Sequence, residues 1–403
     1  MAYTDFIAAI DLGTSHMVGM VGTKNAMGAL SIIAYEVENS GTCIRRGCVY
    51  NVKETASKIR RLILKLENKL GGAKIGQVYV GLGGQSLRSI EHTVCKVLGT
   101  EGVVTEEIID SLYQECKDYR PDMLTVLDVV SPSYFLDDKP ESNPVGVPCS
   151  RIEARYKLIV GRPSLKLNII NSISEQAKIE IAGILVSPLA LGDVVLSDNE
   201  KDLGCALIGF GAGVTTITVY KGGKLASLSV VPFGGNLITK DITNLRVVES
   251  EAERLKITYG SAKADRDNDM TIQVSLADGM GLREIKLAEL NGVIEARMDE
   301  ILENVYARLE ATGLMSVLGA GIVITGGGAA LKNLPAVMSE RLKMEVRYSA
   351  VRKGIVASGD LVVASNPEYA VAVGLLAKGT KNCALYIPPK PEPKIEPVVE
   401  PEP

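Results

Sequence analysis

Tryptophan is absent from this sequence of 403 residues, and histidine occurs only at His16 and His92. Histidine is the commonest metal ligand and a frequent general base, so we do not expect metal or catalytic sites built on it. The seven cysteines are scattered, odd in number and without a Cys-x-x-Cys pair. This pattern argues against a structural zinc site or a disulfide framework and predicts a reducing, cytoplasmic environment.

The sequence also has no large excess of charge of one sign. Its 44 basic and 48 acidic residues are mixed along the chain and leave a net charge of −4. We therefore expect no basic face for nucleic acid. Residues 203–220 and 311–331 carry no charge, but glycines interrupt both, so neither predicts a membrane-spanning helix. The first residues lead directly into a predicted strand, without the segments of a signal peptide.

Glycine is abundant, and one glycine turn near the start organises the rest of the chain. The apolar runs 6–10 and 17–22 are separated by Asp11 and by a turn that contains Gly13, Thr14 and Ser15. This pattern predicts a β-hairpin. Backbone N–H groups at such a tip can converge on an anion, and Asp11 can order a divalent cation whose waters bind phosphate. An ordinary turn is the alternative, and for His16 we expect a place at the hairpin edge.

The same pattern recurs in the second half of the chain. Residues 205–220 form an apolar run, a glycine-rich turn with two threonines and a β-branched run. In both halves a third apolar run follows, at 30–35 and at 225–231. Two similar three-stranded units predict a duplicated α/β fold with a ligand between the halves, with two unrelated meanders as the alternative.

Helical and strand patterns fill the rest of the chain. Apolar residues recur with helical spacing and predict helices over 53–70, 164–178, 236–259 and 290–309. Residues 87–163 instead combine short alternating runs with one helical stretch, which predicts a compact α+β insertion.

A second glycine-rich connection lies near the end of the chain. A predicted strand at 321–325 runs into the glycines 326–328, before a helix predicted from about Leu334 with Asn333 suited to its N-cap. A helix N-terminus favours a negatively charged ligand, and glycines allow close approach. A tight connection without a ligand is the alternative.

Six short stretches carry a resemblance through their order and spacing: residues 9–15, 80–84, 143–146, 251–260, 324–329 and 367–374. Together they resemble the superfamily of actin, the DnaK chaperones and the sugar kinases. Within it, residues 5–386 are similar to the FtsA family of bacterial cell-division proteins. The resemblance implies an α/β fold that is duplicated and actin-like (ribonuclease H-like), with two lobes and an inserted α+β subdomain called 1C.

The resemblance also implies a division of the chain into subdomains. The expected parts are 1A at 1–86, 164–200 and 359–387, 1C at 87–163, 2A at 201–236 and 314–358, and 2B at 237–313. Residues 388–403 are rich in proline and glutamate, which predicts a disordered tail.

ATP with Mg²⁺, in the cleft between the lobes, is the ligand that the resemblance implies. Asp11 matches the carboxylate that orders magnesium. Glu253 and Lys256, one helical turn apart, would contact ribose or adenine, with a structural salt bridge as the alternative. Three loops also match the family pattern. The first phosphate loop is matched by Gly13, Thr14 and Ser15, the second by Gly211, Gly213, Thr215 and Thr216, and the adenosine loop by Gly326, Gly327 and Gly328.

One position departs from the superfamily pattern. The second phosphate loop usually carries an aspartate that orders magnesium and the attacking water, and Gly209 stands at the matching position. Loss of that carboxylate weakens the case for hydrolysis and for phosphoryl transfer to a sugar. The sequence therefore favours ATP as a ligand that controls conformation or polymerisation, with at most weak ATPase activity.

The function that the resemblance implies is that of a cell-division adaptor at the inner face of the membrane, at the division site. It would polymerise through 1C contacts, work with other divisome proteins and bind the C-terminal peptide of the tubulin-like FtsZ on 2B. The candidate contacts for this peptide are Arg283, Lys286 and Arg297, with an ordinary solvated surface position as the alternative for each. Family members reach the membrane through an amphipathic helix after such a tail. The printed sequence ends in the tail, so membrane attachment would use either a segment beyond it or another route. A PilM-like pilus-assembly adaptor and a small-molecule kinase are the alternatives. Residues 143–146 favour the division family over the pilus-assembly adaptor.

Overall fold

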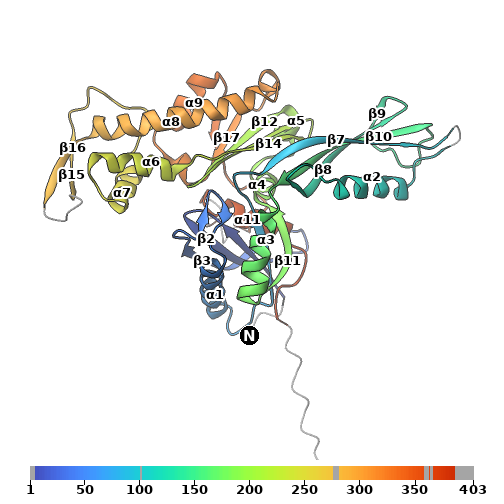
Figure 1. The fold of residues 1–403 in the computed structure, drawn as a ribbon, viewed down its shortest axis with the longest axis horizontal. Coiled ribbons are helices and arrows are strands. Elements are labelled where there is room, and N and C mark those ends of the chain that lie inside the picture. Colours follow the sequence, from blue (N-terminus) through green and yellow to red (C-terminus); the bar gives the residue numbers. More distant parts are fainter. Residues whose placement is uncertain (1–4, 100–101, 276–280, 358–362, 364–365, 386–403) are drawn as a thin grey trace, which may run out of the picture.

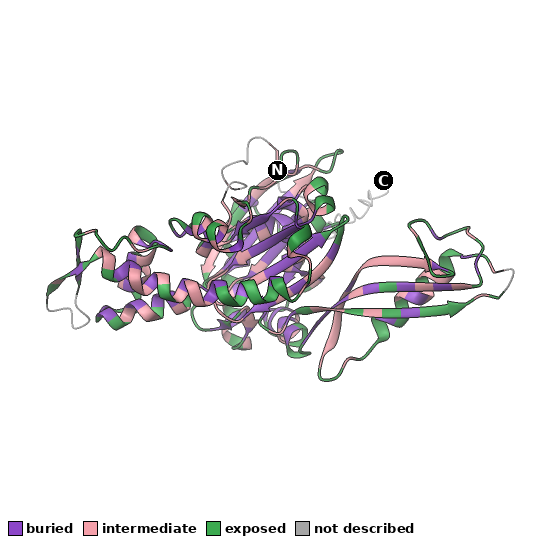
Figure 2. Ribbon diagram, turned by 90° about the horizontal axis from the view of Figure 1, so that it is seen from above, coloured by how far each residue is buried: buried purple, intermediate pink, exposed green. Residues whose placement is uncertain are grey.

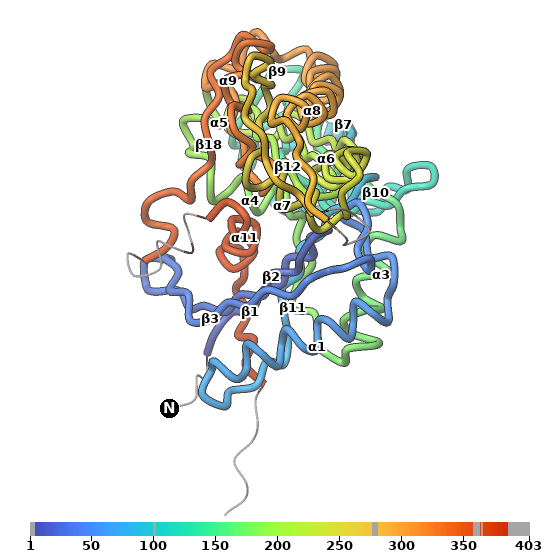
Figure 3. Tube along the Cα trace, turned by 90° about the vertical axis from the view of Figure 1, so that its left-hand side faces the viewer, coloured from blue at the N-terminus to red at the C-terminus, as the bar shows by residue number. Residues whose placement is uncertain are grey.

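The structure is a computed structural model that describes residues 5–99, 102–275, 281–357, 363 and 366–385. The predicted tail, 388–403, and part of the predicted segment 359–387 lie outside the described residues. Two lobes stand one above the other in Figure 3, and two arms extend to opposite sides at the level of the upper lobe in Figure 1.

The first lobe is built on a five-stranded sheet, in the order β11 (Glu180–Val186), β6 (Gln77–Leu82), β1 (Ile7–Leu12), β2 (His16–Lys24) and β3 (Leu30–Asn39). β1 and β2 pair antiparallel, with Asp11 opposite Val18 and Leu12 opposite Met17, which confirms the predicted hairpin. The strands β6 and β11 pair in parallel on the other side of β1.

The second lobe repeats this arrangement. Its sheet has the order β14 (Lys224–Val231), β13 (Thr215–Lys221), β12 (Cys205–Phe210), β17 (Ile322–Thr325) and β18 (Val346–Tyr348). Again three antiparallel strands follow one another, and parallel strands extend the sheet beside the first of them. The predicted duplication is therefore confirmed. The two sheets give a mixed α/β fold of the actin-like kind.

Helices cover the first sheet and fill the space toward the second lobe. They are α1 (Val52–Lys69), α3 (Ser164–Ile170), the π-helical η1 (Asn171–Ala177), α4 (Ser187–Val195) and α11 (Ala370–Lys378). α11 packs on β1 and β2, and α4 contacts β13 of the second lobe. The two helices meet closely, because a Cβ on Gly374 would lie 2.3 Å from the carbonyl oxygen of Ala190.

The second lobe carries its own helices, of which α6, α7 and α8 extend into the left-hand arm of Figure 1. They are α5 (Asp198–Leu203), α6 (Gly235–Ile242), η2 (Thr243–Leu245), α7 (Glu249–Tyr259), α8 (Leu287–Glu310), η3 (Met315–Val317) and α9 (Leu334–Leu342). The hairpin of β15 (Thr271–Ser275) and β16 (Leu282–Lys286) lies at the end of the arm. Within the described part of the chain, no helix combines the length and apolarity needed to cross a bilayer.

Three helix predictions need correction. The pattern over 236–259 predicted one helix, but α6, η2 and α7 replace it, because Arg246 takes a left-handed φ of 61° that an α-helix cannot include. The segment 164–178 is helical, but its second half is π-helical. Asn333 precedes α9 with a φ of 62° and makes no capping bond; its side chain donates to Ser261 Oγ at 3.0 Å instead.

The right-hand arm of Figure 1 is a separate sheet with its own core. Its elements are β7 (Arg88–Val97), α2 (Glu106–Asp118), β8 (Thr125–Leu136), β9 (Lys139–Glu141) and β10 (Arg151–Gly161). The sheet is antiparallel, in the order β7, β10, β8, β9. Leu112, Ile152 and Leu158 are among the residues of a hydrophobic cluster distinct from those of the lobes. Figure 2 shows buried residues among intermediate and exposed ones in this arm, and along β10 every second residue from Ile152 to Leu158 is buried.

Candidate functional site

A cavity of about 290 Å³ lies where the two lobes face each other. Its walls come from the β1–β2 turn, the β12–β13 turn, α7, and the glycines after β17. This volume is at the lower end of the range for small-molecule pockets. The predicted site residues that line it are Asp11, Gly13, Thr14, Ser15, Gly211, Gly213, Thr216, Glu253, Lys256, Gly326, Gly327 and Gly328.

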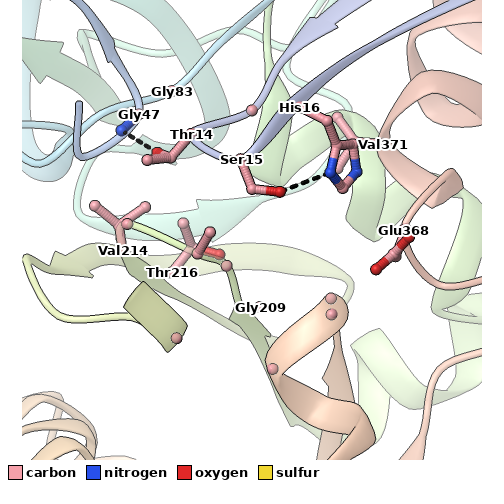
Figure 4. A pocket seen from close by; sticks show the side chains of 18 of the residues that line it. Thr14, Ser15, His16, Gly47, Gly83, Gly209, Val214, Thr216, Glu368 and Val371 are labelled. Atoms are coloured by element: carbon pink, nitrogen blue, oxygen red, sulfur yellow. Dashed lines mark hydrogen bonds between the residues drawn. The ribbon is translucent and has the colours of Figure 1, made fainter. Parts of the chain in front are cut away.

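Hydrogen bonds from neighbouring segments of the first lobe fix the first turn. Thr14 Oγ1 accepts from the backbone N–H of Gly47 at 2.9 Å, and Ser40 Oγ donates to the carbonyl of Gly13 at 2.7 Å. Ser15 Oγ and His16 Nδ1 share a hydrogen bond of 2.6 Å, drawn in Figure 4. His16 pairs with Asn39 at the edge of the β2–β3 ladder, as predicted, and it also lines the cavity.

The second turn meets the first across the cavity. A Cβ on Gly213 would lie 2.5 Å from Thr14 Oγ1, so only glycine allows this approach of the two lobes. The carbonyls of Gly211 and Ala212 accept from the backbone N–H groups of Gly235 and Asn236, at 3.0 and 2.8 Å, which ties the turn to the start of α6.

Thr215 does not line the cavity, unlike the other predicted site residues. Thr215 is fully buried, and its Oγ1 donates to the carbonyl of Phe233 at 2.9 Å, away from the cavity. Successive side chains of a strand point to opposite faces, so Thr215 and Thr216 cannot both face the ligand. Thr216 is the residue that lines the cavity.

The structure leaves no space for a side chain at Gly209, where the superfamily pattern has a carboxylate. A Cβ at this position would lie 2.6 Å from Thr216 Oγ1, so the threonine hydroxyl occupies the space that a side chain would need. Thr325, on the neighbouring strand, also lines the cavity. Its buried Oγ1 has no hydrogen-bond partner among the described residues, which leaves one polar atom at the cavity floor unsatisfied.

Asp11 lies at the base of the cavity, where burial changes its acidity. Burial raises the pKa of the Asp11 carboxyl from 3.8 to about 6, and a hydrogen bond from the backbone of Leu12 offsets part of that effect. A divalent cation at the carboxylate would reverse this cost of ionisation. The described residues contain no cluster of three or more metal-binding side chains, so a cation here would depend on Asp11, water and ligand oxygens.

Glu253 and Lys256 lie on one face of α7, as predicted. Lys256 Nζ lies 2.7 Å from Glu253 Oε2, 2.8 Å from Thr239 Oγ1 and 3.2 Å from the carbonyl of Gly235. The lysine side chain is 15% exposed and the glutamate side chain 43% exposed. The two residues form the salt bridge of the alternative interpretation and also line the cavity, and their contact with ribose or adenine stays a prediction.

The glycine triplet leads into a different element from the one predicted. Gly326 has a φ of 87°, and a Cβ there would lie 2.5 Å from the carbonyl oxygen of Phe210. The triplet continues into the 3₁₀ turn η4 (Gly327–Ala330) and not directly into α9. The helix N-terminus expected beside the ligand is therefore that of a short 3₁₀ turn.

Sequence reasoning missed several residues of the cavity wall. Gly47, Pro188, Asn236 and Glu368 line it and come from four separate segments. A Cβ on Gly327 would lie 3.0 Å from Glu368 Oε1, so the glutamate stands beside the glycine triplet. Of these residues, only Glu368 belongs to one of the six stretches that carried the resemblance.

Comparisons with known proteins agree with this geometry. A family model described as cell division protein FtsA matches residues 206–374. The chain is 39% identical to cell division protein FtsA of Porphyromonas gingivalis over 382 residues, which cover 94% of this chain and 79% of that protein. The identity to FtsA of Bacillus subtilis is 32%, covering 96% of this chain and 86% of that protein.

The chain belongs to the FtsA family of cell division proteins. This membership supports an actin-like role in cell division.

Solved structures agree on the fold alone, because their sequence identities are low. A PilM–PilN type IV pilus biogenesis complex matches with a TM-score of 0.64 at 15% identity, covering 92% of this chain and 97% of that one. MreB5 of Spiroplasma citri bound to ADP matches with a TM-score of 0.51 at 15% identity, covering 92% and 95%.

Proposed function

We propose that this FtsA-family chain binds ATP with Mg²⁺ between its lobes and uses the nucleotide mainly as a conformational ligand in cell division. The observation that carries the proposal is the meeting of two glycine turns across the cavity, with no carboxylate at Gly209. Each turn belongs to a different lobe. A ligand that binds both turns would therefore stabilise one relative position of the lobes.

The residues around the cavity suit a magnesium-bound triphosphate. Gly13 and Gly213 leave backbone exposed where phosphate oxygens would lie, and the Thr14 and Thr216 hydroxyls stand beside them. Asp11 would hold the magnesium through its waters, which favours the ionised carboxylate. The bound nucleotide would supply a row of negative charges that both lobes contact.

Slow hydrolysis is part of the proposal. The acidic side chains of the cavity wall are Asp11, Glu253 and Glu368, among the described residues. Asp11 would be engaged with magnesium, Glu253 is paired with Lys256, and Glu368 lies beside the glycine triplet. None stands at Gly209, where an attacking water would need a base. We expect a turnover below about one per second.

The adaptor function would use the arm at 237–313, which we propose as the docking site of the FtsZ C-terminal peptide. Arg297 is held by Asp241 and Glu300, which indicates a structural role. Lys286 is 63% exposed and pairs with Asp269, which is 92% exposed. Such exposed pairs contribute little, so Lys286 can exchange its partner for an acidic peptide.

The cellular setting of the proposal comes from the family. The protein would act at the inner face of the membrane at the division site, self-assemble through the arm at 87–163 and work with other divisome proteins. The likeness to the PilM–PilN complex concerns the fold alone, so we retain cell division over pilus assembly. A small-molecule kinase would need a carboxylate base, which Gly209 does not provide.

Fluorescence anisotropy of a labelled FtsZ C-terminal peptide, with and without Mg-ATP, tests the adaptor function. We expect saturable binding in the micromolar range, about 8 kcal/mol, with an affinity that changes with nucleotide. Lys286→Glu should weaken binding, while Arg155→Glu on the other arm should not. If wild-type chain that binds ATP captures no peptide in either state, the adaptor function is excluded.

A further inference from the structure

A short turn of the first lobe lies between the two phosphate loops. β4 (Ile44–Arg45) and β5 (Cys48–Val49) form a two-stranded hairpin, and Arg46 and Gly47 make its turn. The Gly47 N–H donates to Thr14 Oγ1 at 2.9 Å. A Cβ on Gly213 of the opposite lobe would lie 3.0 Å from the Cα of Arg46. The turn therefore touches the loops of both lobes.

The backbone of this turn is unusual for an arginine. Arg46 has a φ of 48° and Gly47 a φ of 70°. Two-residue hairpin turns with two positive φ values normally carry asparagine, aspartate or glycine, because a larger side chain is disfavoured there. Gly47 needs its conformation and its lack of a side chain, since a Cβ would lie 3.1 Å from the backbone of Gly84. Arg46 instead places a long cation at a position where the backbone disfavours one.

The Arg46 side chain is exposed and weakly engaged. Its Nη1 donates to Gln85 Oε1 at 3.2 Å, and no carboxylate of the described residues forms an ion pair with it. The adjacent Arg45 differs, because its guanidinium lies 3.7 Å from the centre of the Tyr50 ring. Arg46 is therefore free to exchange a neutral amide for an anion.

Gly47 of this turn lines the cavity, and the exposed Arg46 stands next to it at the cavity edge. Figure 4 shows Gly47 and Val214 at one end of the pocket and Glu368 at the other. Glu368 stands beside Gly327, in the glycine triplet that we assign to the nucleoside. A nucleotide that lies along this cavity would direct its phosphates toward Gly47 and its nucleoside toward Glu368.

We propose that Arg46 binds the terminal phosphate of a bound nucleoside triphosphate and so distinguishes triphosphate from diphosphate. This inference rests on the proposed function, because it requires a nucleotide in the cavity. The planar guanidinium of Arg46 can donate two hydrogen bonds to one phosphate. Its weak hydrogen bond to Gln85 does not prevent this exchange of partners. A diphosphate would not reach the turn, so Arg46 would stay with Gln85.

The test compares equilibrium affinities for Mg-ATP and Mg-ADP in the full chain. Arg46→Ala should weaken ATP binding about tenfold or more and leave ADP binding unchanged, because a charge-assisted hydrogen bond is lost. Arg46→Gly removes the guanidinium and also relieves the backbone, so it should lose the same preference for ATP. Arg45→Ala, one residue away, is the matched control and should keep the wild-type ratio of the two affinities.

Each outcome separates this inference from the proposed function. If the wild type binds neither nucleotide, the proposed function fails and the inference with it. If the wild type binds both and Arg46→Gly keeps the wild-type ratio, the guanidinium does not sense the phosphate and the inference is overturned. An equal loss of ATP and ADP affinity in Arg46→Ala overturns it as well, since that result indicates a structural role for the turn.

Discussion

Gly213→Ala should separate the lobes without unfolding them. The added Cβ would lie 2.5 Å from Thr14 Oγ1 and 2.8 Å from Thr14 Cγ2, both on the opposite lobe. Overpacking of this kind costs about 1–3 kcal/mol. Because Gly213 and Thr14 belong to turns of different lobes, a small opening of the cavity can relieve the clash. We therefore expect the cost to reduce affinity for Mg-ATP by about 5- to 150-fold, with little change in the melting temperature.

Titration with a fluorescent ATP analogue measures this loss, and differential scanning calorimetry without nucleotide measures stability. Gly83→Ala is the matched control, because Gly83 lines the same cavity and an added Cβ would meet nothing within 4 Å. Wild-type affinity in Gly213→Ala would refute the argument that glycine permits the lobes to close. An equal loss in Gly83→Ala would show that any side chain in the cavity wall has this effect.

Three further substitutions test the site and its support. Asp11→Asn should stabilise the nucleotide-free protein at pH 7 by at most about 3 kcal/mol, because each pKa unit corresponds to about 1.4 kcal/mol and burial raises the carboxyl pKa from 3.8 to about 6. The free energy of unfolding of the wild type should fall by this amount as pH rises from about 4 to 6, and that of Asp11→Asn should not. Melting temperatures of both proteins measured against pH test this, and a parallel fall in both would contradict the assignment. Lys256→Met removes three hydrogen bonds near the cavity and should lower ATP affinity about tenfold. Arg254→Met removes an ion pair on the same helix at a residue that does not line the cavity, and it should change ATP affinity less than twofold in the same titration. Glu200→Gln should cost about 1 kcal/mol in urea unfolding at pH 7, because Glu200 accepts from Arg347. Burial opposes the ionised form of Glu200, but hydrogen bonds from Ser197 and Arg347 lower its pKa below 4.5. The difference in unfolding free energy between wild type and Glu200→Gln should therefore be present above pH 4.5 and disappear as pH falls below it. A difference that grows on acidification would exclude the mechanism.

The fold could be predicted because its signals are local and repeated. The alternation of apolar residues around Gly13 and around Gly211 specifies two hairpins, and the register of β1–β2 and of β12–β13 agrees with it. The glycines of both turns also identified the site, since each faces the cavity. In these segments the antiparallel partner of the first strand is the next strand along the chain.

Prediction failed where a distant contact decides the local structure. Thr215 and Thr216 are adjacent and chemically identical, and only the pairing of β13 with β12 and β14 determines which hydroxyl faces the cavity. Asn333 has the composition of an N-cap, but its side chain binds Ser261 from a distant part of the chain. Local propensity contributes little beside such tertiary contacts.

The sequence by itself determined the duplicated hairpins, the glycines at their turns and the absence of a carboxylate at position 209. Only the tertiary structure placed Thr14 and Arg46 against Gly213, and only burial gave Asp11 its raised pKa. Hydrophobic periodicity acts over a few residues along the chain and can be read from the sequence. The contacts between the lobes at the cavity, such as that of Thr14 with Gly213, join residues more than a hundred positions apart, and they exist only once the two lobes have folded against each other.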